Sequence, residues 1–553
     1  MTAANIVTSA ARVVLRSGLF APAGPLTMFR IVREAVRGGA NLAAVTAIAA
    51  ARWPDRTAVI DDDGALSYRQ LQSRTESVAA ALVYRHGIGP GVSVGILCRN
   101  GRAFMQAMFA AASVGADVVL LNTEFRTDAL ATALGAHRIQ TVICDDEFAD
   151  RVRAADDAVA VVDLAALEID EREPRPKAGP RGRFVLLTSG TTGTPKGVPR
   201  TPSITPALGV GVVFLDRIGL RAGNRIVVPV PMFHAFGFGM VLLTVILGGT
   251  LLTRRRFDAE ATLAQASLHR AHVLAAVPVM LARILDLPDE VRARNPVPSL
   301  RVVITAGARL DPSLAQRFMD AYGEILYNGY GSSEVAMGSL ATPADLREAP
   351  ETVGRPVDGC PVEILDENGS PVGPHVTGRV FVGGGLTFDG YSGGGGKDVV
   401  AKMTATGDMG YFDEAGRLFI VGREDDMIVS GGENVYPSAV ENALGKHPDV
   451  ADHAVIGVPD EDFGQRLAAF VVARPGADIG EAKLREYLKD KVSRFEQPRD
   501  ITVVAAIPRN PSGKVLRKEL GHDQPHRPTP PRAKRRKGQI LDRGGRAGPE
   551  ALG

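Results

Sequence analysis

Short apolar runs that alternate with helix-length segments are the feature that most restricts the fold of this chain. From about residue 44 to 424 the runs are bounded by glycine and proline, and they include FVLL (184–187), RIVVPV (225–230), RVVI (301–304) and RVFV (379–382). Each run is continuous in hydrophobicity, which is typical of strands buried on both faces. Strands that alternate with helices indicate α/β architecture. We therefore predict a large α/β domain over residues 44–424.

A change of character near residue 424 predicts a second, smaller domain. The segment from Gly422 to Pro437 is polar and glycine-rich, which suits a hinge, and Pro437 is well placed to begin a helix. The apolar runs HAVIGV, LAAFVV and ITVV and the helical pattern IGEAKLREYLKDKVSRF then indicate a small, mobile α+β domain over residues 425–520. Residues 521–553 are rich in proline, glycine and basic residues, so we expect a disordered tail.

Composition and charge restrict the partners of the chain. Apolar residues make up 45% of the 553 residues and charged residues 23%, as in a soluble globular protein of several domains. A formal net charge of +2 is close to balance and argues against a nucleic-acid partner. Cys98, Cys144 and Cys360 are widely spaced and form neither a disulfide framework nor a metal cluster. We expect a cytoplasmic protein.

Two segments raise the question of membrane contact. Residues 1–43 mix arginines with apolar residues, and two interpretations remain open: an amphipathic helix on a membrane surface, or a helix packed on the main domain. The proline break between Pro22 and Pro25 disfavours a single helix. The apolar stretch 236–252 falls short of the roughly 20 residues that cross a bilayer, so we expect a buried helix there. The oligomeric state is not predicted.

The strongest local motif is LLTSGTTGTPKGV, residues 186–198, in which a predicted strand enters a loop of glycine and hydroxyl residues ending at Lys196. Glycines let backbone N–H groups approach phosphate oxygens, hydroxyls add donors and the lysine adds a positive charge. The motif is neither a Walker A loop nor a dinucleotide fingerprint, because Pro195 and Gly197 occupy positions that a Walker A loop reserves for glycine and a hydroxyl residue. It therefore indicates a phosphate-binding loop of another kind.

With this loop the chain resembles the adenylate-forming enzymes, which include acyl-CoA synthetases, luciferases and peptide-synthetase adenylation domains. Their phosphate loop reads T-S-G-T-T-G-x-P-K-G, and residues 188–197 match it throughout. The resemblance extends over roughly residues 44–520 and makes the large domain an adenylation domain of several subdomains. It implies that ATP phosphates are bound by Thr188, Ser189, Gly190, Thr191, Thr192, Gly193, Thr194 and the catalytic Lys196.

Three further segments resemble the nucleotide and acyl sites of this family. PMFHAFGF (231–238) places His234 at the substrate entrance as a catalytic residue, and TAGARL (305–310) lines the adenine and acyl pocket with Gly307 and Ala308. In YNGYGSSE (327–334), Tyr330 is expected to stack on adenine and Glu334 to hold Mg²⁺ at the phosphates. The other nucleotide contacts implied by this motif are Asn328, Gly329, Gly331, Ser332 and Ser333.

The remaining matches lie toward the C-terminus. TGD (406–408) resembles the ribose-binding motif, in which two carboxylate oxygens of Asp408 suit paired hydroxyls. In GREDD, Arg423 is expected to contact ribose and phosphate, and Asp425 to act as the hinge. Gly431 and Gly432 belong to the segment that lines the CoA tunnel in the family. PRNPSGK (508–514) resembles the motif that delivers a catalytic lysine, here Lys514.

The resemblance implies an ATP-dependent acid–CoA ligase that uses ATP, Mg²⁺ and coenzyme A. We expect a medium- or long-chain fatty acid, because the segments around the motifs are apolar and no charged residue marks a site for an ammonium group. Aryl or amino acids, a carrier-protein thiol as acceptor, and a luciferase-type oxidation remain open. So does a non-catalytic nucleotide-binding scaffold, although such a protein would not need Lys514. The chain departs from the family pattern at Arg379, where glutamate is common.

Overall fold

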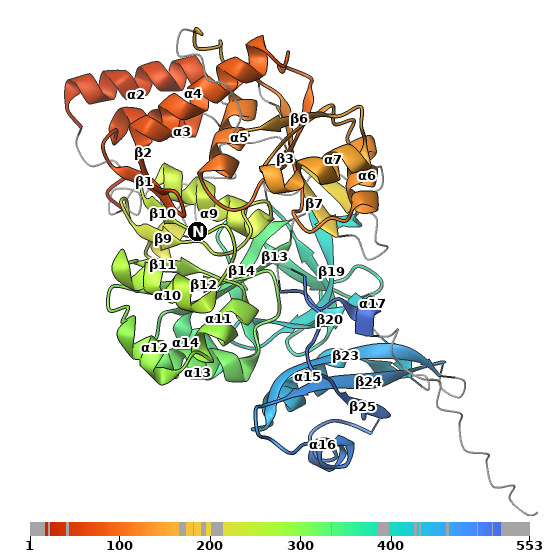
Figure 1. The fold of residues 1–553 in the computed structure, drawn as a ribbon. Coiled ribbons are helices and arrows are strands. Elements are labelled where there is room, and N and C mark those ends of the chain that lie inside the picture. The colour runs from red at the N-terminus through yellow and green to blue at the C-terminus, as the bar shows by residue number, and fades with distance from the viewer. Residues whose placement is uncertain are drawn as a thin grey trace, which may run out of the picture.

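The computed structural model has a large N-terminal part and a small C-terminal part, which lies at the lower right in Figure 1. It describes residues 17–19, 23–39, 42, 44–164, 173–180, 182–189, 195–200, 214–332, 335–384, 397–424, 428–430, 433–460, 464–494, 496–510 and 513–520. The α/β class and the two-domain architecture predicted above are confirmed. The boundaries at 43/44, 424/425 and 520/521 stay predictions, and the expected tail lies outside the described residues.

A six-stranded sheet forms one subdomain within the described part of the large domain. Its strands follow the order β6-β5-β3-β4-β7-β8, and all neighbours are parallel except β7 and β8. The strands are β3 (Ser93–Leu97), β4 (Asp117–Leu120), β5 (Thr141–Cys144), β6 (Ala160–Asp163), β7 (Phe184–Ser189) and β8 (Pro195–Arg200). Its connecting helices are α5 (Arg102–Ser113), α6 (Thr127–Ala136), η1 (Asp146–Phe148) and α7 (Ala149–Ala155).

A second, larger sheet changes from parallel to antiparallel at β13. Its parallel half comprises β1 (Thr57–Asp61), β10 (Thr250–Leu252), β9 (Arg225–Val227), β11 (Val273–Ala275), β12 (Val302–Thr305) and β13 (Leu326–Ser332), with β2 (Gly64–Ser67) antiparallel at the edge. Its antiparallel half comprises β14 (Ala336–Ala341), β15 (Thr352–Pro356), β20 (Leu418–Arg423), β19 (Met403–Phe412), β18 (Val399–Val400), β17 (Gly378–Val382) and β16 (Val362–Leu365).

Helices cover the large sheet, and several start at residues that favour helix N-termini. Ser67 forms a capping box with Gln70 at the start of α4, and Thr342 forms one with Asp345 at α14. Proline stands in the first turn of α11, α13 and α14. The helices are α3 (Ala44–Arg52), α4 (Tyr68–Tyr84), α9 (Ala235–Ile246), α10 (Ala259–Leu268), α11 (Pro278–Leu285), α12 (Asp289–Arg294), α13 (Pro312–Tyr322) and α14 (Pro343–Glu348).

The predicted strands within 184–382 are present, with one difference in pairing. The runs at 184–187, 225–230 and 301–304 overlap β7, β9 and β12, each of which has at least one parallel neighbour. The run at 379–382 lies in β17, whose neighbours are antiparallel. This strand is nevertheless largely buried, since Val380 and Val382 belong to one apolar cluster and Phe381 to another. The continuous apolar runs therefore predicted which strands are buried, but they did not predict whether a strand is parallel or antiparallel to its neighbours.

The apolar stretch 236–252 contains a helix and a strand. Helix α9 ends at Ile246, and β10 begins at Thr250 after the turn at Gly248 and Gly249. Half of the 12 residues of α9 are buried and only Gly239 and Ile246 are exposed, in agreement with a helix packed in the protein. Within the described residues, no helix combines the length and hydrophobicity that a membrane span requires.

The small domain contains β21 (Ile428–Ser430), β22 (Glu433–Val435), β23 (Val450–Asp460), β24 (Gly464–Ala473) and β25 (Asp500–Val503), with α15 (Pro437–Gly445), α16 (Glu481–Leu488) and α17 (Arg517–Leu520). Pro437 begins α15 as predicted. The helix expected from the pattern at 479–495 is shorter, because the chain turns after Leu488. The glycine-rich segment that follows the predicted hinge contributes β21 and β22, which pair with each other.

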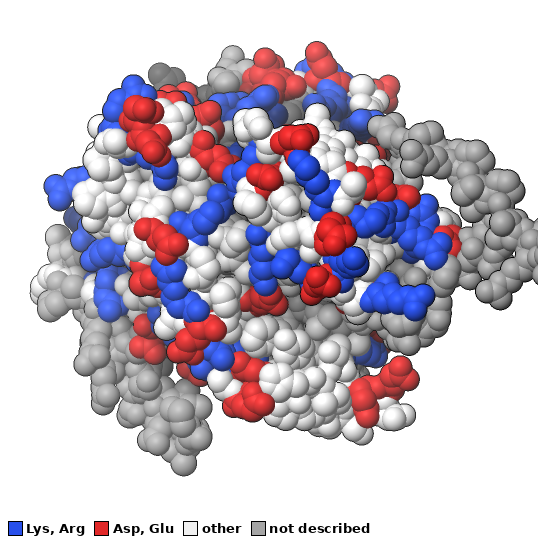
Figure 2. Space-filling view, turned by 90° about the horizontal axis from the view of Figure 1, so that it is seen from below, with Lys and Arg blue, Asp and Glu red and all other residues white. Residues whose placement is uncertain are grey.

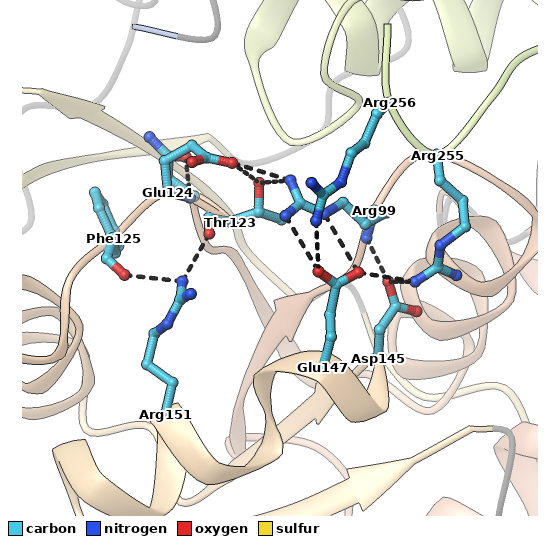
Figure 3. Close-up of polar contacts among 10 residues, drawn as sticks. Arg99, Thr123, Glu124, Phe125, Asp145, Glu147, Arg151, Arg255 and Arg256 are labelled. Atoms are coloured by element: carbon cyan, nitrogen blue, oxygen red, sulfur yellow. Dashed lines mark hydrogen bonds and ion pairs between the residues drawn. The ribbon is translucent and has the colours of Figure 1, made fainter.

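Ion pairs join the two sheets of the large domain (Figure 3). Arg99 follows β3 and contacts Glu124 at 2.9 Å and Glu147 at 3.2 Å. Arg255 follows β10 of the other sheet and contacts Glu147 and Asp145, each at 3.0 Å. Because Glu147 accepts from arginines of both subdomains, it holds the two sheets in one relative orientation.

Charge is distributed evenly on the face of the molecule seen from below. Figure 2 shows lysine and arginine side chains interspersed with aspartate and glutamate over this face. Such mixing produces no strong field of one sign. The distribution therefore agrees with the near-balanced net charge of +2.

Candidate functional site

Several predicted site residues lie at the carboxyl ends of β12 and β13, where parallel strands of α/β sheets commonly present ligand-binding loops. Thr305 at the end of β12 pairs with Asn328 of β13, and both side chains are buried. Gly307 follows with φ of +84°, a conformation that favours glycine. A side chain at Gly329 would come within 3.4 Å of the Met337 Cε atom. The strand ends thus form a surface of small residues, as expected for contact with flat ligand groups.

Tyr330, Asp408 and Arg423 lie together across β13, β19 and β20. The Tyr330 hydroxyl donates a hydrogen bond to Asp408 Oδ2 at 2.5 Å, and Arg423 Nη1 lies 3.7 Å from Asp408 Oδ1. Asp408 and Arg423 are directly paired on adjacent strands. The predicted adenine, ribose and phosphate contacts are therefore brought to one place.

Burial sets the titration of this cluster. It raises the pKa of Asp408 above its usual value, against the opposing effects of the Tyr330 hydrogen bond and the charges of Arg423 and Lys514. It also raises the pKa of Tyr330, and the Asp408 carboxylate adds to that rise. Tyr330 is therefore a neutral hydroxyl donor that holds the carboxylate in a fixed orientation.

A tight turn in the small domain presents Lys514. The backbone N–H of Gly513 donates to the Asn510 carbonyl at 2.8 Å, and the Lys514 N–H donates to Asn510 Oδ1 at 2.8 Å. Arg509 braces the turn through the Gly513 carbonyl at 2.9 Å and through Asp452 at 2.7 Å. Gly513 has φ of +81°, so the turn needs glycine at this position. The predicted catalytic lysine thus stands on a well-supported turn.

This turn is seated against the large domain. A side chain at Gly513 would lie 3.0 Å from Val279 Cγ1 and 3.5 Å from Val277 Cγ2. Val277 also borders Gly307, at 3.9 Å from the corresponding position. Burial raises the pKa of Asp408, and the positive charge of Lys514 is among the influences that oppose this rise.

Contacts between α13 and α15 hold the small domain in this position. Arg309 donates to the Ser438 carbonyl at 3.2 Å and lies 3.4 Å from Glu441, and the Ser313 hydroxyl donates to the Gly445 carbonyl at 3.0 Å. Lys446 pairs with Glu351 at 3.4 Å. A cavity of about 520 Å³ lies beside these contacts, lined by Pro312, Ser313, Gln316, Arg317, Ala349, Pro350, Glu351, Phe419 and Lys446.

His234 is the N-cap residue of α9, directly before the first helical residue. Its Nε2 atom is buried without a hydrogen-bond partner among the described residues, and its ring lies 4.5 Å from that of Phe233. Burial lowers the pKa of His234 to about 4. The imidazole is therefore neutral at physiological pH and presents an unpaired nitrogen.

The predicted phosphate loop is described only at its flanks. Strands β7 and β8 pair so that Thr188 lies opposite Lys196 and Ser189 opposite Pro195. This hairpin encloses 190–194, which contains Gly190, Thr191, Thr192, Gly193 and Thr194 and lies outside the described residues. Also outside them are Ser333, Glu334, Asp425, Gly431 and Gly432. The remaining predicted residues Ala308, Gly331 and Ser332 lie at the ends of β12 and β13.

The side chains that could hold Mg²⁺ are few in the described part of the chain. No group of three or more His, Cys, Asp or Glu side chains in the described part of the chain is arranged to hold a metal ion. A single carboxylate such as Glu334 fits Mg²⁺, which commonly takes one or two carboxylates and binds substrate phosphates for the rest.

Two buried residues were missed by the sequence analysis. The Asn100 amide donates to the Val230 carbonyl at 2.8 Å, and its oxygen accepts from the Met232 N–H at 2.9 Å, so it braces the loop before His234. Thr305 has a buried hydroxyl without a partner among the described residues, beside Asn328. No local pattern marks Asn100, whereas Thr305 lies within TAGARL and could have been found there.

Family comparisons decide the class of this site. The family described as AMP-binding enzyme matches residues 47–392, and its C-terminal domain matches residues 439–514. The chain belongs to the AMP-binding enzyme family. This assignment confirms the resemblance found in the motifs.

Similar AMP-binding enzymes include a feruloyl-CoA synthase from Amycolatopsis sp, 33% identical over 84% of this chain and 96% of the relative. An indoleacetate–CoA ligase from Aromatoleum aromaticum is 30% identical over 84% of this chain and 95% of the relative. Both names describe CoA-ester formation from an acid.

Solved AMP-binding enzymes share the fold. The o-succinylbenzoate CoA synthetase from Bacillus subtilis, in complex with its acyl-adenylate intermediate, has a TM-score of 0.77 at 26% identity, covering 87% of this chain and 98% of that chain. The same synthetase has been solved with ATP and a magnesium ion, with a TM-score of 0.76. The chain is thus an AMP-forming acid–thiol ligase, with ATP, Mg²⁺ and coenzyme A as its cofactor and co-substrates.

Proposed function

We propose that this ligase activates an apolar carboxylic acid as an acyl adenylate and transfers the acyl group to coenzyme A. In this proposal Lys514 stabilises the negative charge on the α-phosphate during the first step. The observation that carries the proposal is the seating of the Lys514 turn against Val277 and Val279, since Val277 also borders Gly307 of the predicted nucleotide pocket. A lysine held there supports reaction at a nucleotide whose ribose is bound by Asp408.

In the first step, a carboxylate oxygen of the acid attacks the α-phosphorus of ATP, and the bond to the pyrophosphate leaving group breaks. Negative charge builds on the phosphate oxygens, and positive groups that are already in position stabilise it without reorganisation. Lys514 would meet the α-phosphate and Lys196 the departing phosphates. Mg²⁺, held by Glu334, would supply further neutralisation of phosphate charge.

In the second step, the coenzyme A thiolate attacks the acyl carbonyl and AMP leaves with the shared oxygen, while the thiol proton passes to solvent. The turn that carries Lys514 would then have to withdraw, so that the coenzyme A thiol can reach the acyl adenylate. We propose rotation of the small domain about Asp425, bringing Gly431 and Gly432 to the thiol channel. Such a hinge motion reorganises a site between chemical steps.

The acid class is proposed from the side chains that surround Gly307, Gly329 and Gly513. These are Val277, Val279, Ala306 and Met337, all apolar. An ammonium group would be costly to bury beside them without a paired carboxylate. We therefore propose an acid with an uncharged apolar body.

An aryl acid is the first candidate, because the names of the relatives describe feruloyl, indoleacetate and succinylbenzoate substrates, all aromatic. The medium- or long-chain fatty acid predicted from the sequence is the second candidate, since the same valines and methionine suit an alkyl chain. It stays a prediction.

Pyrophosphate release tests the proposal with purified protein, ATP and Mg²⁺, offering aryl, fatty and amino acids with and without coenzyme A. We expect one aryl or fatty acid to give slow release alone and steady turnover once the thiol is added. Release with amino acids only would contradict the apolar-acid assignment. If no acid gives release while ATP still binds, the non-catalytic scaffold becomes the better account.

A further inference from the structure

Helix α2 (Pro25–Gly38) exposes an unusual number of large apolar side chains. Their exposed fractions are 63% for Leu26, 46% for Met28, 65% for Phe29, 53% for Val32 and 77% for Val36. A surface helix of a globular protein normally turns its apolar stripe toward the core. Here the large apolar residues face outward, at the periphery of the molecule beside α3 (Figure 1).

The exposed residues are ordered into two adjacent rows. At about 100° per residue, Met28, Phe29, Val32 and Val36 fall on one side of the helix. Arg30, Arg33 and Arg37 have helical spacing and form a second row along the edge of this apolar stripe. An apolar stripe bordered by arginines is the pattern of helices that lie in a membrane interface.

Polar contacts explain why the helix presents this side. Glu34 is the one acidic residue between Pro25 and Gly38, and it is buried at 6% exposure. It pairs with Arg175 at 3.1 Å and with Arg33 at 2.8 Å. Arg175 also contacts Glu76 of α4 at 3.0 Å. These contacts attach the Glu34 side of α2 to the large domain, so the opposite side must face outward.

The positive charge on the exposed side of α2 indicates what kind of partner can bind there. Three arginines and one buried glutamate give α2 a net charge of +2 by simple count from the sequence. A second copy of this helix would bring two positive rows together, which opposes association. Arg33 and Arg37 lie within ion-pair distance of Glu34, whereas an anionic lipid surface offers acyl chains to Phe29 and Val36 and phosphate charge to Arg30.

We propose that α2 docks the enzyme on anionic membrane surfaces. Met28, Phe29, Val32 and Val36 enter the boundary between headgroups and acyl chains, and Arg30 contacts lipid phosphates at its edge. The 14 residues of α2 lie in the plane of the interface, since at 1.5 Å per residue they are too short to cross a bilayer. This proposal is independent of which acid the enzyme uses.

Vesicle flotation tests the proposal with the full chain, using phosphatidylcholine vesicles with and without phosphatidylglycerol. We expect binding to the anionic vesicles that weakens with added salt. The double variant Phe29→Ser, Val36→Ser should lower the partition coefficient about tenfold or more, and Arg30→Gln about fivefold. Leu268→Ser, a change at an apolar residue of α10 that is 76% exposed, is the matched control and should leave binding unchanged.

Pyrophosphate exchange by each variant verifies that the site is intact, and light scattering of each variant follows its assembly. Equal vesicle binding by the wild type and the double variant, or no binding to anionic vesicles, would overturn the proposal. So would a wild-type oligomer that dissociates in the double variant, because α2 would then be covered by a second copy of the chain.

Discussion

At the residue scale, the proposed first half-reaction would depend on one lysine, Lys514, which follows a turn held by backbone and side-chain hydrogen bonds. Asn510 and Gly513 form the turn, and Arg509 ties it to Asp452 on β23. The side chain of Lys514 is exposed on this support, so its replacement should not disturb the fold. This separation makes the residue a clean test of the proposed mechanism.

We expect Lys514→Ala to slow acyl-adenylate formation about 10²- to 10³-fold, the range found when one preorganised charge-stabilising donor is removed. Transfer from a supplied acyl adenylate to coenzyme A should change little, since the lysine acts before the domain rotates. Single-turnover assays of each half-reaction measure both. Lys489→Ala, at an exposed lysine of the same domain, is the control. An equal loss in both half-reactions would contradict the assignment.

His234 makes stability depend on pH, because burial lowers its pKa to about 4 in the folded state. Its usual value is about 6.5, so between these values the unfolded chain binds more protons and stability falls as pH decreases. Between pH 7 and pH 5 the neutral-histidine contribution should decline by about 2 kcal/mol. His234→Gln should lack this part of the decline in denaturant titrations at the two pH values. Parallel curves for the variant and the wild type would refute it.

At the element scale, contacts at α15 connect the small domain to the large domain, and we call these contacts the latch. Arg309 and Ser313 contact the two ends of α15, and Lys446 adds an ion pair beyond it. All are surface contacts of modest strength. Weak contacts suit the proposed rotation, in which the small domain would leave this position once in every catalytic cycle.

Removing part of this latch should affect one half-reaction selectively. We expect Arg309→Ala to slow adenylation about threefold to tenfold, equivalent to roughly 1 kcal/mol for a half-exposed contact. Thioester formation from a supplied acyl adenylate should be unchanged or faster. Arg294→Ala on α12 is the control, since its pairing with Glu260 is distant in sequence from α15 and highly exposed. Slowing of both half-reactions alike would argue against a latch.

At the scale of the whole molecule, the large domain depends on the ion pairs that join its two sheets (Figure 3). Arg99 is well covered at 14% side-chain exposure and contacts Glu124 and Glu147. Its removal leaves Glu147 with Arg255 and Arg256, whose side chains are more exposed. The loss of folding free energy in an Arg99 variant should therefore come mainly from the missing contacts of Arg99 itself.

Arg99→Ala should lower the free energy of unfolding by about 2 kcal/mol, between the values for exposed and buried pairs. Arg153→Ala removes an exposed pair with Asp150 in the same subdomain and should cost under about 0.5 kcal/mol. Denaturant titrations followed by fluorescence and circular dichroism measure both. Equal effects of the two variants would show that the network contributes no more than a surface pair.

The sequence by itself determined the fold class, the phosphate-loop motif, the start of α15 at Pro437 and the strands β7, β9 and β12. Each of these follows from short-range preferences: glycine and proline restrict the backbone locally, and continuous apolar runs require burial. The same motifs named Asp408, Tyr330 and Lys514 as candidate site residues, which stay predictions, whereas the family resemblance that the motifs indicated is confirmed.

Only the tertiary structure decided how distant segments meet. It placed the Lys514 turn on Val277 and Val279, set Asn100 beneath the loop before His234, and joined the sheets through Glu147. It also turned the apolar side of α2 outward, because Glu34 pairs inward with Arg175. These contacts link residues far apart in the chain, and their partners depend on packing, which no local pattern encodes.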